Sequence, residues 1–168
     1  MLGVSRSCWW AGAERSLLAL WVGGLWVAGY VVAPSLFATL DDRQLAGQLA
    51  GQVFRLMSYI GLVAGGLLLL SVLVRVAGNW TREWRVWVLV SMLVLVAIGA
   101  FVIQPMMVEL KIGGIVPGSE KAATFGRMHG ISSILFLVTS LLGLSLVAVG
   151  LQTGLAGRGC NRPVTAED

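Results

Sequence analysis

Long runs without a charged residue divide the chain, and these runs predict its helices. They are Ser16–Leu40, Leu56–Val74, Val86–Val108 and Met128–Gly157. A helix needs about 20 apolar residues to cross the hydrocarbon core of a bilayer. The runs are continuously apolar, whereas a membrane-spanning strand alternates apolar and polar residues. The pattern therefore predicts an all-α membrane protein, a bundle of four transmembrane helices.

The domain boundaries expected from these runs are simple. A transmembrane domain of residues 16–152 lies between cytoplasmic segments at residues 1–15 and 153–168, and its spans are at about residues 16–40, 56–74, 86–108 and 131–151. The first run is about twice as long as the apolar core of a signal peptide. We therefore expect it to be a retained helix.

The polar stretches between the runs carry helix signals of their own. Glutamine recurs at every fourth position before the second span, at Gln44, Gln48 and Gln52. This period is typical of an amphipathic helix, and either Asp41 or Asp42 is placed to cap it. Ser119 follows a Pro-Gly pair and is placed to cap a helix that leads into the fourth span. Two spans are thus expected to extend beyond the bilayer.

Composition and charge agree with a protein dissolved in lipid. Hydrophobic residues make up 57% of the chain and charged residues 12%, whereas soluble domains carry about a quarter charged residues. The N-terminal segment, the second loop and the C-terminal segment hold most of the Lys and Arg residues: Arg6, Arg15, Arg75, Arg82, Arg85, Arg158 and Arg162. This bias predicts that both termini are cytoplasmic. No basic stripe or aromatic-basic module indicates nucleic-acid binding, so the expected partner is the lipid bilayer.

The two halves of the chain resemble each other when one is shifted by 71 positions. The shift superimposes Trp9 on Trp80, Tyr30 on Phe101, Pro34 on Pro105, Gly47 on Gly118, Phe54 on Phe125, and Met57 on Met128. This offset predicts two tandem helical hairpins that form a parallel pseudo-repeat. Pro34 and Pro105 would kink the first helix of each hairpin because each removes a backbone hydrogen bond. The alternative, that these prolines only end helices, stays open here.

Small residues predict close helix packing. Gly61 and Gly65 have the GxxxG spacing, which lets helix backbones approach closely. The approach could be made inside the bundle, in a homodimer, or with another membrane protein. The sequence does not choose between these partners.

Polar residues near the helix ends form the candidate site. His129 is the single histidine, and Ser132 and Ser133 share its helical face. The other candidates for an outer polar pocket are Arg55, Tyr59, Gln104 and Glu109. Ionisable residues at membrane depth are often functional. Arg55 and Glu109 are also close enough to the helix ends to be interfacial anchors.

A metal or haem site is a more specific hypothesis for the residues around His129. His129 could ligate haem or copper together with thioether sulfur atoms from Met57, Met106, Met107 or Met128. One histidine cannot supply a pair of imidazole ligands within one chain, and methionine in an apolar helix usually serves packing. We therefore expect no cofactor, and metal or haem binding at His129 is the alternative.

No catalytic motif is complete. One histidine without a paired nucleophile forms no hydrolase triad, and no phosphate-binding loop or dinucleotide fingerprint occurs in context. The leading hypothesis is a non-enzymatic structural, interaction or stress-related membrane protein. The alternatives are a membrane redox protein that binds haem or copper through His129 and, third, a small transporter.

Several short motifs occur along the chain in an order and spacing that resemble those of a known protein family. They are Gly29-Tyr30, Pro34, Phe37, Ala46-Gly47, Gly51, Phe54, Phe101, Pro105-Met106, Phe125, His129-Gly130 and Ser132-Ser133. Over residues 15–150 the chain resembles the transmembrane-protein-205-like family, also known as the bacterial domain of unknown function 4149. The resemblance implies a small four-helix protein of the bacterial inner membrane with no assigned reaction. More distantly, the layout is similar to copper resistance protein D and the membrane-bound protoporphyrinogen oxidase, which implies metal or haem chemistry.

Overall fold

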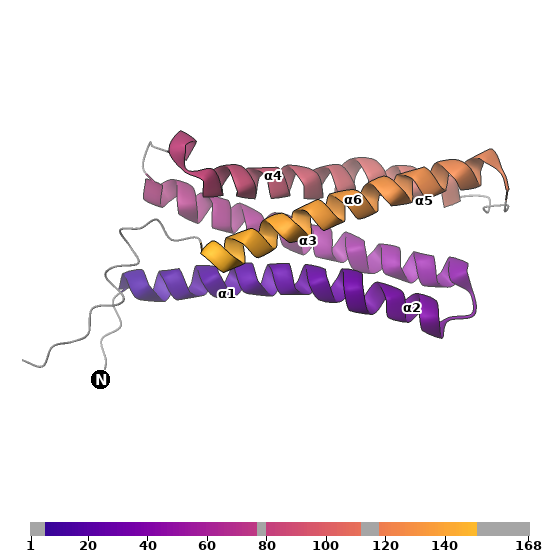
Figure 1. Cartoon of the computed structure of the whole chain (residues 1–168), viewed down its shortest axis with the longest axis horizontal. Helices are drawn as coiled ribbons and strands as arrows, with labels where there is room; N and C mark the ends of the chain where they lie inside the picture. The colour runs from indigo at the N-terminus through magenta and orange to yellow at the C-terminus, as the bar shows by residue number, and fades with distance from the viewer. Residues whose placement is uncertain (1–5, 77–79, 112–117, 151–168) are drawn as a thin grey trace, which may run out of the picture.

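The computed structural model describes residues 6–76, 80–111 and 118–150, which fold into a bundle of helices (Figure 1). Four helical stretches are long and apolar enough to cross a membrane: Trp9–Thr39, Arg43–Val76, Trp84–Lys111 and Glu120–Val149. The predicted four-helix, multi-pass membrane architecture is thereby confirmed. The predicted C-terminal segment, residues 153–168, lies outside the described residues.

The helices run alternately up and down the bundle. Their bounds are α1 (Arg6–Trp26), the π-helical segment η1 (Val27–Val32), α2 (Ala33–Thr39), α3 (Arg43–Val76), the 3-10 turn η2 (Trp80–Arg82), α4 (Trp84–Ile98), the π-helical segment η3 (Gly99–Ile103), α5 (Gln104–Lys111) and α6 (Glu120–Val149). The start of α1, the start of α4 and the end of α6 lie at one end of the bundle, here called the Trp84 end (Figure 1). The opposite end, where α2 leads into α3 and α5 ends, is called the Asp42 end.

Two caps begin the helices that extend from the Asp42 end. One carboxylate oxygen of Asp42 accepts hydrogen bonds from the backbone N–H groups of Gln44, at 2.7 Å, and Leu45, at 3.2 Å. The hydroxyl of Ser119 accepts a hydrogen bond from the backbone N–H of Ala122, at 3.2 Å. Each cap satisfies donors that the first helical turn leaves without a partner. Both predicted caps are confirmed, with Asp42 chosen over its neighbour.

The two paired prolines lie in helices that continue past them. Directly before each proline the helix widens into a π-helical turn, in η1 and in η3. The N–H of Ala33 donates to the carbonyl of Ala28, and the N–H of Gln104 donates to the carbonyl of Gly99. These two bonds each reach five residues back and lie 71 positions apart, which is the offset of the sequence repeat. The prolines therefore do not end the helices, and the shared π turn supports two tandem hairpins.

The GxxxG face of α3 packs within the chain. Gly61 and Gly65 are buried, and the ring of Trp21 from α1 lies against both. A Cβ atom built on Gly61 would lie 2.6 Å from the indole nitrogen of Trp21, which is closer than atoms can pack. The absence of a side chain at these positions therefore lets α1 approach α3. Binding of a second copy or of another membrane protein stays a prediction, and the GxxxG face of α3 does not support it because that face is already buried within the chain.

The buried core lies mainly toward the Trp84 end. It consists of Leu18, Trp21, Val22, Leu25, Ala64, Leu68, Val72, Val86, Leu89, Met92 and Leu146. Many large apolar side chains outside this core are exposed, such as Leu20 at 74% and Val74 at 73%. An apolar surface of this extent would be unfavourable in water and is suited to lipid.

Candidate functional site

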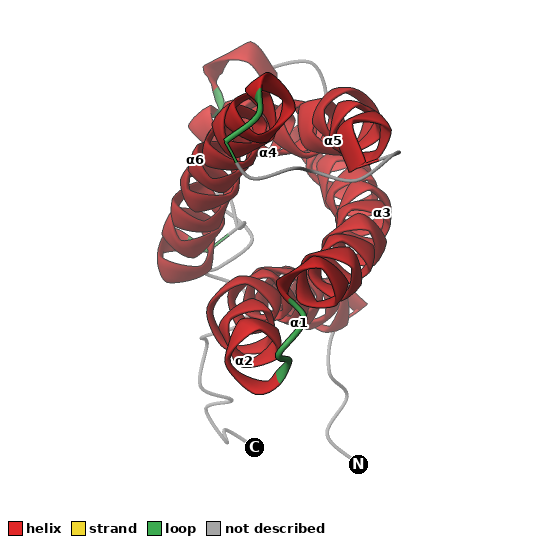
Figure 2. Ribbon diagram, turned by 90° about the vertical axis from the view of Figure 1, so that its right-hand side faces the viewer, coloured by secondary structure: helices red, strands yellow, loops and turns green. Residues whose placement is uncertain are grey.

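A large pocket opens in the half of the bundle nearer the Asp42 end. Its volume is about 1340 Å³, and its walls come from all four helical stretches. Figure 2 looks into this end of the bundle, where α2, α3, α5 and α6 stand around the centre. α6 crosses diagonally from α5 at the Asp42 end to α1 at the Trp84 end (Figure 1). Because of this tilt, the helices close on one another only toward the Trp84 end.

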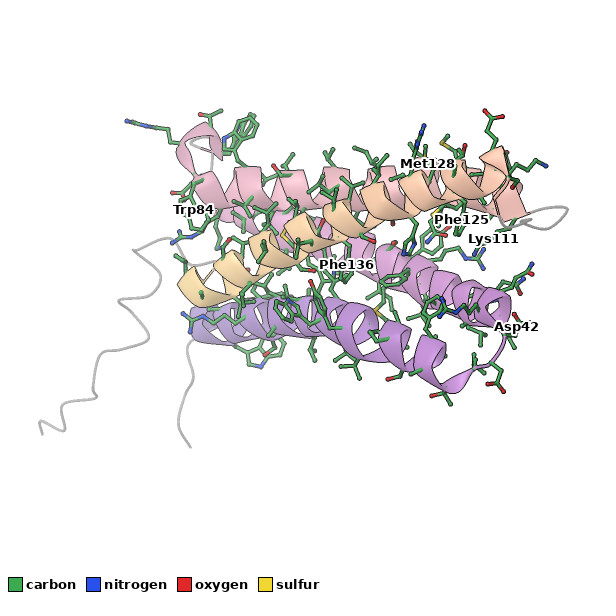
Figure 3. All side chains as sticks on the ribbon, turned by 45° about the vertical axis from the view of Figure 1, so that its right-hand side comes forward. Asp42, Trp84, Lys111, Phe125, Met128 and Phe136 are labelled. Carbon is green, nitrogen blue, oxygen red and sulfur yellow. The ribbon has the colours of Figure 1, made fainter. Side chains whose placement is uncertain are left out.

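Aromatic side chains line the deeper part of the pocket. The ring of Phe136 lies 6.0 Å from the ring of Tyr30 and 5.4 Å from that of Phe54, measured between centroids. Figure 3 places Phe136 between α6 and α1. Gly29 makes this position available, since a Cβ atom there would overlap the Phe136 ring. Leu25 belongs both to the pocket wall and to the buried core, so the pocket ends on the core.

Most of the predicted site residues share this pocket. Its lining includes Arg55, Gln104, His129, Ser132 and Ser133. These residues come from three helices and lie far apart in the sequence, so the bundle itself brings them together. Pro34, which is predicted to kink its helix, also lines the pocket.

Tyr59, Glu109 and Pro105 do not line the pocket. Tyr59 is exposed and lies beside Phe101, with ring centroids 6.5 Å apart. On α5 the pocket face is formed by Gln104, Met107, Val108 and Lys111, which have the i, i+3, i+4, i+7 spacing of one helical face. Glu109 and Pro105 lie off that face and are exposed. Sequence position near the proline was therefore not sufficient to place Glu109.

The environment of His129 differs from the expected one. Its imidazole stacks on the ring of Phe125, with centroids 6.4 Å apart and planes inclined by 11°. The hydroxyl of Ser133 donates to the backbone carbonyl of His129, at 2.9 Å, and not to its ring. This bond between a serine and the carbonyl four residues earlier is common in membrane helices. The serines therefore do not define the orientation of the imidazole.

Lys111 also lines the pocket. Its ammonium nitrogen donates to the backbone carbonyl of Gly47 on α3, at 3.2 Å. The same nitrogen lies 5.4 Å from the centre of the Phe125 ring on α6, a cation–π contact. Figure 3 shows Lys111 and Phe125 side by side at this end of the bundle. The lysine thus joins α5 to α3 and α6.

The charged residues of the pocket wall are all basic. Arg43, Arg55 and Lys111 line it, together with the glutamines of α3, and within the described part of the chain no aspartate or glutamate does. Among the described residues, the two ion pairs are Arg75 with Glu14 and Arg85 with Glu83, both outside this pocket. The charged side chains described in the pocket wall are therefore positive, and none of the three belongs to either ion pair.

A metal centre finds limited support in the geometry. Within residues 6–76, 80–111 and 118–150, no three His, Cys, Asp or Glu side chains gather as a metal site. His129 shares the pocket with Met57 and Met107, whereas Met106 and Met128 do not line it. Haem or copper binding at His129 stays a prediction.

A second polar cluster lies toward the Trp84 end. Glu14 of α1 is buried, and its carboxylate lies 2.6 Å from the guanidinium of Arg75 on α3. The hydroxyl of Ser71, one turn earlier on α3, donates to the other carboxylate oxygen. We expected residues 1–15 to lie outside the spans, whereas α1 begins at Arg6 and carries Glu14 into the bundle. A buried carboxylate with two partners is a structural tie between α1 and α3.

The comparisons with known proteins identify a family and nothing more specific. No curated protein and no solved structure matches the chain. The similarity to transmembrane protein 205 and to copper resistance protein D therefore stays a prediction. Residues 16–115, which include the first three spans, match the family described as Domain of unknown function (DUF4149). The chain belongs to this family, to which no function is assigned.

Proposed function

We propose that this protein is a non-enzymatic membrane protein that binds an amphiphilic molecule from the bilayer in the pocket at its Asp42 end. Structural, interaction and stress-related roles all agree with the sequence, and the pocket favours an interaction role. The observation that carries the proposal is the size and lining of the pocket. Small-molecule pockets span about 300–1,000 Å³, and this one reaches about 1340 Å³.

The lining supports a ligand with an apolar and a polar part. Phe54, Phe136 and Met57 offer aromatic and thioether surface in the deeper part, suited to hydrocarbon. Arg43, Lys111 and the glutamines of α3 offer hydrogen-bond donors closer to the Asp42 end. A molecule that places its chain among the former and its headgroup among the latter satisfies both parts of the wall.

The helix arrangement supports access from the lipid. α2 packs along α3, while α6 leans away toward α5 at the same end (Figure 2). In the described part of the chain, no comparably extensive contact joins α2 to α6. A bilayer molecule can therefore enter sideways between these two helices without crossing water.

The orientation in the membrane is a further part of the proposal. We place the protein in the bacterial inner membrane with both termini in the cytoplasm, because most of the Lys and Arg residues lie on the side of the termini. The Asp42 end then faces outward. A reporter enzyme that is active only outside the cytoplasm should stay inactive when fused after Asp168, and should be active when inserted between Gly113 and Ser119. The reverse pattern would contradict this orientation.

Native mass spectrometry of the purified protein tests amphiphile binding. The protein extracted from its own membranes in mild detergent should carry one amphiphile that survives repeated detergent exchange, because pocket walls from all four helical stretches contact it. Loss of every bound species at low detergent would contradict the proposal.

A visible spectrum and a metal analysis of the same sample test the alternative, a haem or copper redox protein. This alternative rests on His129 sharing the pocket with Met57 and Met107. A Soret band or stoichiometric copper that His129→Ala abolishes would establish that alternative instead.

A further inference from the structure

We propose that the amphiphile is an anionic lipid whose phosphate headgroup is bound by Lys111, with Arg43 and Arg55 completing a basic wall. This inference rests on the proposed amphiphile binding and adds the charge of the ligand. The argument is charge complementarity. Among the residues that the structure describes, three cations line the pocket and no acidic side chain does. An anion in the pocket removes the repulsion between these cations and gains charge-assisted hydrogen bonds.

Lys111 is held in a position that suits a phosphate. One N–H donor of its ammonium group is used by the carbonyl of Gly47, at 3.2 Å. An ammonium group has three donors, so two remain for a ligand. The contact with the Phe125 ring, at 5.4 Å, fixes the side chain from a third helix. The cation is therefore preorganised, which lowers the entropic cost of binding.

The two arginines lie on either side of this lysine along α3. A helix rises about 1.5 Å per residue. Arg43 is therefore about 6 Å from Gly47 along the helix axis, and Arg55 is about 12 Å from Gly47 in the other direction. Gln44, Gln48 and Gln52 fill the interval and also line the pocket. The resulting wall of donors is long enough for a phosphate and the polar groups attached to it.

Basic residues elsewhere at this end provide the comparison for a simple interfacial anchor. Lys121 and Arg127 of α6 are exposed and do not line the pocket. Such side chains interact with lipid headgroups in general, without selecting one bound molecule. Lys111 differs because it contacts two other helices and lines the pocket beside aromatic rings. The proposal therefore predicts that replacing Lys111 lowers the preference for an anionic lipid and that replacing Lys121 does not.

The test measures lipid binding to the full chain by native mass spectrometry, after its own lipids have been removed. We expect phosphatidylglycerol to bind about tenfold more tightly than phosphatidylcholine, because both lipids carry a phosphate but only phosphatidylcholine also carries an ammonium group, which the basic wall repels. Lys111→Gln should abolish the preference, Lys111→Arg should retain most of it, and Lys121→Gln should leave it unchanged. Thermal unfolding of each variant shows whether it is folded.

The outcomes separate the two proposals. Equal binding of both lipids to the wild-type protein would overturn the anionic headgroup and leave amphiphile binding intact. Binding of neither lipid, or only of detergent, would overturn both. A preference that Lys111→Gln and Lys121→Gln reduce equally would assign the charge effect to general interfacial attraction and would overturn the role of Lys111.

Discussion

The replacement Gly65→Leu is expected to prevent formation of the native bundle. A Cβ atom at this position would lie 2.8 Å from the Trp21 ring of α1 and 2.8 Å from a methyl carbon of Leu93 on α4. Trp21 is 4% exposed and cannot swing out of the core. Overpacking a dense core costs about 1–3 kcal/mol and sometimes more. Leucine adds four carbon atoms between three helices, so we expect a loss of about 3 kcal/mol or more.

The neighbouring glycine provides a matched control. A Cβ atom on Gly66 meets no other atom within 4 Å, so Gly66→Leu adds the same side chain to the same helix turn without a clash. In mild detergent, Gly65→Leu should be aggregated or unfold at a much lower temperature, while Gly66→Leu should unfold near the wild-type temperature. Equal unfolding temperatures for the two variants would contradict the packing of Trp21 against α3.

The helices were predictable because the interactions that form and cap a helix lie within a short stretch of sequence. Four charge-free runs define the spans because lipid admits only backbone that satisfies its own hydrogen bonds. Asp42 and Ser119 were predictable as caps because a cap accepts hydrogen bonds from the first turn of its own helix, only two or three residues away. The repeat around the two prolines was visible in the sequence as a 71-residue offset. The π turns before them were not predicted, because the sequence signals only a missing hydrogen bond.

The site was predicted only in part because it depends on how the helices tilt. Arg55 and His129 were found from their type and depth, and both line the pocket. Tyr59 lies one turn from Arg55 in sequence, yet the rotation of α3 turns its ring to Phe101. The position of Lys111 depends on its hydrogen bond to Gly47, which joins residues 64 positions apart. Periodicity gives no information about such long-range contacts.

The burial of Glu14 at the Trp84 end also depends on contacts that the sequence pattern does not reveal. The sequence places it before the first apolar run, where a charged residue is expected to be in water. Its burial depends on Ser71 and Arg75, which lie on a different helix. A buried ion pair costs desolvation, which its mutual attraction must offset. A charge next to a span can therefore belong to the bundle when a partner at the same depth neutralises it.

Filling the pocket is expected to expel the bound amphiphile without unfolding the protein. Gly51 lines the pocket, and a Cβ atom there meets no other atom within 4 Å. In Gly51→Trp the indole ring would extend into the space that the proposal assigns to the ligand. Steric overlap of this kind costs at least about 1.4 kcal/mol, which corresponds to about a tenfold loss of affinity. Gly66→Trp adds the same side chain outside the pocket lining.

The most direct test of the pocket's role is therefore a comparison of wild type, Gly51→Trp and Gly66→Trp by native mass spectrometry, with each protein purified from the same membranes. The account predicts that wild type and Gly66→Trp retain the amphiphile, and that Gly51→Trp loses most of it while unfolding at a temperature near that of wild type. Retention of the same amphiphile by a folded Gly51→Trp would contradict the claim that this pocket is the binding site.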